Sequence, residues 1–145
     1  MRSKLIPLLA IFAITSCLTV YAAVQYQGFI TATGKVVVVN IEIYSDQTCT
    51  VKLSSIDWGS LTPGQSKSVT CYLKSTSTVN STLSMSTGSW NPTSASSYIS
   101  LSWNREGYKI KPAEVVSTTL TLTVSQSITG ISSFSFTITI TATEA

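Results

Sequence analysis

The strictest pattern in the chain is the alternation of apolar and hydroxyl side chains from Ser133 to Thr143. Successive side chains of a strand point to opposite sides, so a period of two residues is typical of a strand with one buried face. The apolar members are Phe134, Phe136, Ile138, Ile140 and Ala142. The run therefore predicts a sheet strand, with Phe136 and Ile138 in the core.

Shorter strand-like runs precede it, and no helical period appears after residue 23. The runs lie at residues 35–44, 48–53, 67–74, 80–86, 98–103 and 116–124. Turn signals separate them, above all Leu61-Thr62-Pro63-Gly64, in which proline sets the first corner and glycine accepts a positive φ at the second. Seven or eight short strands at this spacing predict one antiparallel β-sandwich, of jelly-roll or Ig-like type, over residues 35–145.

The first 23 residues read as a secretory signal peptide. Arg2 and Lys4 form a basic start, residues 5–13 are mostly apolar, and small residues near Ala22 fit a cleavage site. A transmembrane anchor is the weaker interpretation, because Thr15, Ser16 and Thr19 interrupt the apolar run. A third interpretation is a lipoprotein, since residues 14–17 resemble a lipobox ending at Cys17. All three export the chain, so we expect an extracellular protein at the cell surface.

The charge of the exported chain excludes a nucleic-acid partner. Without Arg2 and Lys4, seven basic residues stand against six acidic ones, and they form no basic stripe. Serine and threonine make up about a third of the chain, a composition that suits sheets with hydroxyl-lined outer faces. So few charges indicate either an ordinary extracellular sandwich or a protein that packs against copies of itself.

The start of the exported chain, residues 24–34, carries another strand pattern followed by a hinge. One face of residues 24–33 holds Val24, Tyr26, Gly28, Ile30 and Ala32. A terminal segment is loose unless something ties it down, so this strand either pairs within its own sheet or pairs with another molecule. Gly28 lacks a side chain, which suits close approach of another backbone, and Gly34 supplies a flexible joint before Lys35.

Two cysteines remain after export, Cys49 and Cys71, and both fall on the expected inward faces of strands. Two cysteines left in an exported chain usually pair, so we expect a disulfide; two buried free thiols are the alternative. Asn80 begins an Asn-Ser-Thr sequence and is a candidate for glycosylation.

No catalytic or metal site is visible in the sequence. The chain contains no histidine, which removes the usual general base and the commonest metal ligand. Its six acidic residues are scattered singly, and no motif for a nucleophile or a phosphate is present. We expect no enzyme, no cofactor and no small-molecule substrate; only a carboxylate cluster formed in three dimensions could still bind calcium. Trp58 and Trp90 lie beside turns and suit either a core or a sugar-stacking role.

Residues 56–73, IDWGSLTPGQSKSVTCYL, resemble a turn-and-strand pattern of exported archaeal and bacterial sandwiches. The later pieces WNP at Trp90, YISLSW at Tyr98 and SITGI at Ser127 extend the similarity along the chain. The whole exported chain is similar to the archaeal bundling pilins, which are related to the TasA and camelysin biofilm-matrix proteins. This resemblance implies a jelly-roll subunit that inserts its N-terminal strand into the next subunit, a process called donor-strand complementation.

Two functions follow from these observations. The first is a secreted structural subunit that forms a homopolymeric pilus or matrix filament, with residues 24–33 as the donor strand. Its only partners would be copies of itself, and it would meet the membrane only during export. The alternative is a monomeric Ig-like module for binding or anchoring at the cell surface, with or without a lipid on Cys17.

Overall fold

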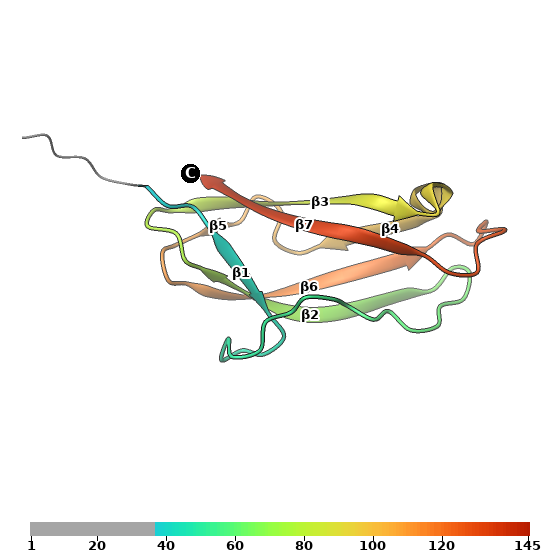
Figure 1. Ribbon diagram of the computed structural model, residues 1–145, viewed down its shortest axis with the longest axis horizontal. Coiled ribbons are helices and arrows are strands. Elements are labelled where there is room, and N and C mark those ends of the chain that lie inside the picture. Colours follow the sequence, from blue (N-terminus) through green and yellow to red (C-terminus); the bar gives the residue numbers. More distant parts are fainter. Residues whose placement is uncertain (1–36) are drawn as a thin grey trace, which may run out of the picture. The chain divides into compact units, whose positions relative to one another are not determined.

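The computed structural model describes residues 37–145, which belong to one compact unit that begins at Lys35. Within it two antiparallel sheets pack face to face (Figure 1). The predicted all-β sandwich is therefore confirmed. The predicted signal peptide at 1–23, the donor strand and hinge at 24–34, and the candidate lipidation site at Cys17 lie outside the described residues.

The first sheet, here called sheet A, has the order β1-β2-β6-β4, and the second, sheet B, has the order β5-β3-β7. Sheet A consists of β1 (Ile41–Tyr44), β2 (Ser66–Ser75), β6 (Val115–Val124) and β4 (Ile99–Trp103). Sheet B consists of β5 (Lys109–Ile110), β3 (Ser81–Asn91) and β7 (Ser135–Glu144). A 3-10 helix, η1 (Thr93–Ser97), joins β3 to β4. Nothing helical among residues 37–145 is long and apolar enough to cross a membrane.

The period of two decides which side chains fill the core. On β6, Leu120, Leu122 and Val124 are buried, while the residues between them point outward or are only half-buried. Burying one such side chain contributes about 1.5–3 kcal/mol. The outer face of sheet A is lined by hydroxyl groups, such as those of Ser68 and Thr121, which hydrogen-bond across β2 and β6 at 2.8 Å.

Before β2, two of the predicted strands differ from the structure. The strand expected at 35–44 starts only at Ile41, although Val38 and Asn40 already form hydrogen bonds with residues 76–78, which follow β2. The strand expected at 48–53 is a turn, apart from an isolated bridge between Tyr44 and Lys52. The cause is Asp46, whose carboxylate accepts hydrogen bonds from residues 48, 50 and 51 and so holds their main chain in a turn.

The predicted disulfide between Cys49 and Cys71 is not formed, because the two residues lie in different environments. Cys71 is wholly buried on the inner face of β2, as its phase predicts. Cys49 lies in the turn built around Asp46, with a positive φ of 54° and a partly exposed side chain. Both cysteines carry free thiols. The prediction that Cys49 points inward from a strand is therefore wrong.

Candidate functional site

The strand β7 has a free edge. Its neighbour on one side is β3, and no other strand among residues 37–145 pairs along its second side. Its apolar side chains have the inward phase that the sequence predicts, and they pack against the core. However, Phe136, Ile138 and Ile140 are only half-buried, because the sheet does not continue beyond β7. The face with the strictest strand pattern is thus incompletely covered.

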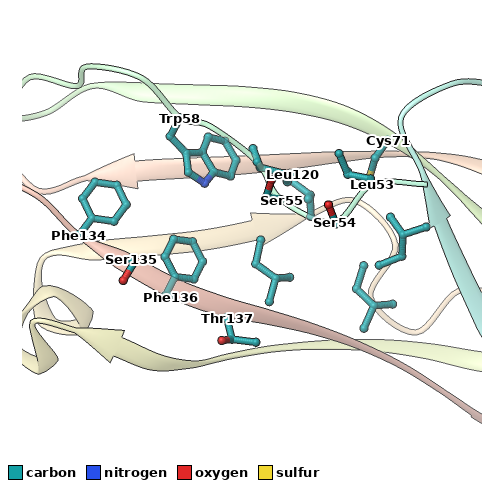
Figure 2. A pocket seen from close by; sticks show the side chains of 14 residues that line it. Leu53, Ser54, Ser55, Trp58, Cys71, Leu120, Phe134, Ser135, Phe136 and Thr137 are labelled. Carbon is teal, nitrogen blue, oxygen red and sulfur yellow. The ribbon is translucent and has the colours of Figure 1, made fainter. Parts of the chain in front are cut away.

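A groove of about 360 Å³ lies between β7 and the chain segment 53–58 (Figure 2). Phe134 and Phe136 project from β7 toward Trp58, whereas Thr137 points away from the groove (Figure 2). The side chains around this space are mainly apolar and none is charged; they include Ile43, Leu53, Ile56, Trp58, Cys71, Leu120, Phe134, Phe136, Ile138 and Ile140. The groove can therefore receive apolar side chains, and the edge of β7 offers it main-chain hydrogen-bonding groups.

The segment 53–58 forms the second wall of the groove because it is fixed at both ends. At one end the Leu53 amide donates to the Ile43 carbonyl at 2.9 Å. At the other end the Lys67 ammonium donates to the Trp58 carbonyl at 2.7 Å. The Trp58 side chain itself is 7% exposed and belongs to the core. Between these anchors Ser54 and Ser55 are exposed, so this wall is pinned without being a regular strand.

Stacked aromatic rings pack beside the groove. The rings of Trp90 and Phe136 lie 4.2 Å apart at 11° from parallel, and Phe134 lies 6.2 Å from Phe136. Such a pair contributes about 0.5–1.5 kcal/mol beyond the area that it buries. Trp58 and Trp90 thus take part in packing around this groove, which is the core role that the sequence left open.

A second cleft, of about 600 Å³, continues the groove at the end of the sandwich where β7 begins. It lies between the loops at 56–63 and 128–134, and it shares Ile56, Trp58 and Phe134 with the groove. Its half-buried apolar side chains include Leu61, Ile128 and Ile131. Together the two spaces form one channel along the open side of the sandwich.

The lining of the groove contains one ionisable side chain, the thiol of Cys71. Burial raises the pKa of the Cys71 thiol to about 11, so this thiol stays protonated at neutral pH and is a poor nucleophile. Within the part of the chain that the structure describes, no three histidine, cysteine or acidic side chains lie close enough to hold a metal ion.

The structure describes only some of the candidate residues that the sequence indicates. Val24, Tyr26, Gly28, Ile30 and Ala32 lie outside the described residues. Asn80 is exposed directly before β3. The sequence did not indicate that residues 53–58 form a wall of the groove, because their apolar side chains follow no regular period. One signal was present: Lys67 stands at an inward position of β2, which an ordinary core strand would fill with an apolar residue.

No family model matches this sequence, and searches of curated proteins and of solved structures found no match either.

Proposed function

We propose that the protein is a secreted structural subunit that polymerises into an extracellular filament. In this proposal, residues 24–33 of one copy enter the groove of the next copy and pair with the free edge of β7. The observation that carries the proposal is the half-buried apolar face of β7 beside an edge with no strand partner among the described residues.

The donor and the groove have matching patterns. Residues 24–33 place Val24, Tyr26, Gly28, Ile30 and Ala32 on one face, and β7 presents apolar residues to the groove with the same period of two. Both segments are ten residues long. Adding such a strand gives main-chain hydrogen bonds to the edge of β7 and covers its half-buried side chains, which is the physics of β-augmentation.

The edge of β7 also lacks the usual protection against pairing. Proteins commonly block a free edge with charged residues, proline or a bulge. β7 carries no charged residue and no proline from Ser135 to Thr143, and its one acidic residue is Glu144 at its end. A long edge strand without these features is a template for pairing with another strand, which supports a partner strand as part of the working state.

The assembly that results is open. A strand contributed by one copy to a different surface of the next makes a heterologous contact, and such contacts generate filaments when the rotation does not close.

Single charges in the donor and in the groove test this proposal in the exported chain. Ile30→Asp places a carboxylate on the donor face, and Ile138→Asp places one in the groove; both should abolish filaments under negative-stain electron microscopy. The matched controls are Thr31→Asp and Thr139→Asp, which change the opposite faces and should still assemble. Mixing the two defective variants should give only short complexes, because one intact donor then meets one intact groove.

The Ile30→Asp variant decides the question if Ile138→Asp fails to fold. Filaments that persist with Ile30→Asp would remove residues 24–33 as the donor strand. An unmodified exported chain that never assembles would instead favour the monomeric Ig-like surface module. A truncated chain that starts at Lys35 should bind a synthetic peptide of residues 24–33, and absence of binding would count against the proposal.

A further inference from the structure

The two ends of the sandwich differ, and the difference constrains how a donor strand enters. The end where the described chain begins, here called the leading end, also holds the C-terminus. There Val38 exchanges hydrogen bonds with Thr78, and the Ala145 amide donates to the Asn80 carbonyl at 3.0 Å. The opposite end, here called the far end, holds the loops 56–63 and 128–134 and the start of β7. Figure 1 shows the start of β1 and the C-terminus at one end and the loop before β7 at the other.

The linker between donor and sandwich is too short to span these ends. The ten residues of β7 extend over roughly 34 Å. From Thr33 to Val38 the chain covers at most about 18 Å, even when it is fully extended. Residue 33 of the donor leaves the acceptor groove at one of its two ends. Because the linker is short, that end of the acceptor must lie beside the leading end of the donor's own sandwich.

A donor parallel to β7 would emerge at the acceptor's leading end. Two leading ends would then meet, and each chain could pass its strand to the other, which closes the pair as an isologous dimer. The same direction would also let the segment return into its own groove. A donor antiparallel to β7 emerges instead at the far end, so that unlike ends meet and the contact can repeat.

We infer that the donor strand runs antiparallel to β7, with Ala32 toward Phe134 and Val24 toward Ala142. The leading end of each sandwich then docks into the far-end cleft of the next copy. This inference rests on the proposed function, because it specifies how the same groove is filled.

Both surfaces that this arrangement joins carry apolar side chains. At the leading end, Val37 and Val38 are each 44% exposed, an unusual exposure for two consecutive valines. At the far end, the cleft carries the half-buried side chains of Ile128 and Ile131. Antiparallel entry brings the two valines next to this cleft, whereas parallel entry brings them next to the valines of the partner.

Disulfide trapping measures the direction of entry. Thr33 lies on the outward face of the donor, and Ser133, Ser135, Thr141 and Thr143 share the outward phase of the run that forms β7. A disulfide forms only between residues that lie opposite, or nearly opposite, each other on neighbouring strands. The exported chain with Cys49→Ser would carry Thr33→Cys together with Ser133→Cys or Ser135→Cys; two other variants combine Thr33→Cys with Thr141→Cys or Thr143→Cys.

Antiparallel entry predicts a ladder of covalent oligomers from the 133 or 135 pairs on a non-reducing gel, and no ladder from the 141 or 143 pairs. A ladder from the 141 or 143 pairs, covalent dimers alone, or a link within one chain would overturn the inference. Intact filaments without any link would overturn it too, because β7 would not be the neighbour of the donor.

A second measurement separates this inference from the proposed function. Val37→Asp should prevent filaments while leaving peptide 24–33 bound as tightly as before, and Val37→Ser should restore assembly in part. Filaments that tolerate Val37→Asp would remove the end-to-end contact but leave donor-strand exchange in place. Loss of peptide binding by the unsubstituted sandwich would instead remove the proposed function and this inference together.

Discussion

Trp90 of β3 and Phe136 of β7 stack with their ring centroids 4.2 Å apart and their planes 11° from parallel. This contact holds one side of Phe136, while the remainder of its side chain lines the groove beside Trp58. The half-buried position of Phe136 therefore reflects an open sandwich edge, and its energetics should differ from those of a closed core.

Replacing Phe136 with alanine should lower the free energy of unfolding by about 2–3 kcal/mol. This is less than the roughly 3–5 kcal/mol typical of a fully buried phenylalanine, because part of its surface is already in water. Urea denaturation of the exported chain measures the change, with Thr137→Ala on the outward face as a control within about ±0.5 kcal/mol. A Phe136→Ala effect as small as the control would show that this face is not packed.

Removing the Lys67 ammonium should loosen the groove wall. Lys67→Met retains most of the side-chain length but loses the hydrogen bond to the Trp58 carbonyl. We expect a loss of about 1 kcal/mol in the free energy of unfolding, together with a shift of tryptophan fluorescence. Lys109→Met, at an exposed position of β5, provides the control. Equal changes in stability and fluorescence in the two variants would mean that the Lys67 ammonium does not hold Trp58 in place.

The two cysteines should differ sharply in reactivity. Desolvation raises the pKa of Cys71 to about 11, and its side chain is wholly buried, whereas Cys49 is partly exposed in a turn. Iodoacetamide at about pH 8 should therefore modify Cys49 in the folded protein and leave Cys71 intact. Mass spectrometry of peptides checks this, with urea-unfolded protein as the control in which both react. A cross-linked Cys49–Cys71 peptide would contradict the free thiols.

The turn around Asp46 should resist acid. The Thr48 hydroxyl and the amides of Val51 and Thr50 hydrogen-bond to the carboxylate and hold the pKa of Asp46 far below its usual range. Because the pKa of Asp46 is lower in the folded protein than in the unfolded chain, its carboxylate stabilises the folded protein fully above about pH 4, where an unfolded Asp is ionised. This stabilisation is lost as the pH falls toward the pKa of Asp46 in the folded protein.

The amide resonance of Val51 should accordingly keep its chemical shift down to about pH 3, below the usual midpoint of Asp. Asp46→Asn should abolish this behaviour and broaden the resonances of residues 48–51, while Glu144→Gln should change neither. Titration of the Val51 amide near pH 4 in the unsubstituted protein would show that the hydrogen bonds to Asp46 do not persist in solution.

Much of the sandwich follows from the sequence alone. The alternating runs that end at Val124 and Thr143 predict strands whose phase the structure confirms, because side chains of a strand must alternate and apolar ones must leave water. The sequence did not predict the turn at residues 48–53. Their alternating pattern is typical of a strand, but hydrogen bonds to the Asp46 carboxylate hold the main chain in a turn.

Only the tertiary structure decides which strand stands at an edge. The sequence gives Phe136 and Leu122 the same alternating surroundings, yet Leu122 is wholly buried and Phe136 is half-buried. The reason is that alternation specifies the face of a strand, whereas coverage depends on its neighbours, and strand order results from contacts between residues far apart in the chain. The groove beside β7 results from that strand order. The wall of the groove, which the hydrogen bond from Lys67 to the Trp58 carbonyl holds in place, likewise depends on contacts that the sequence pattern does not specify.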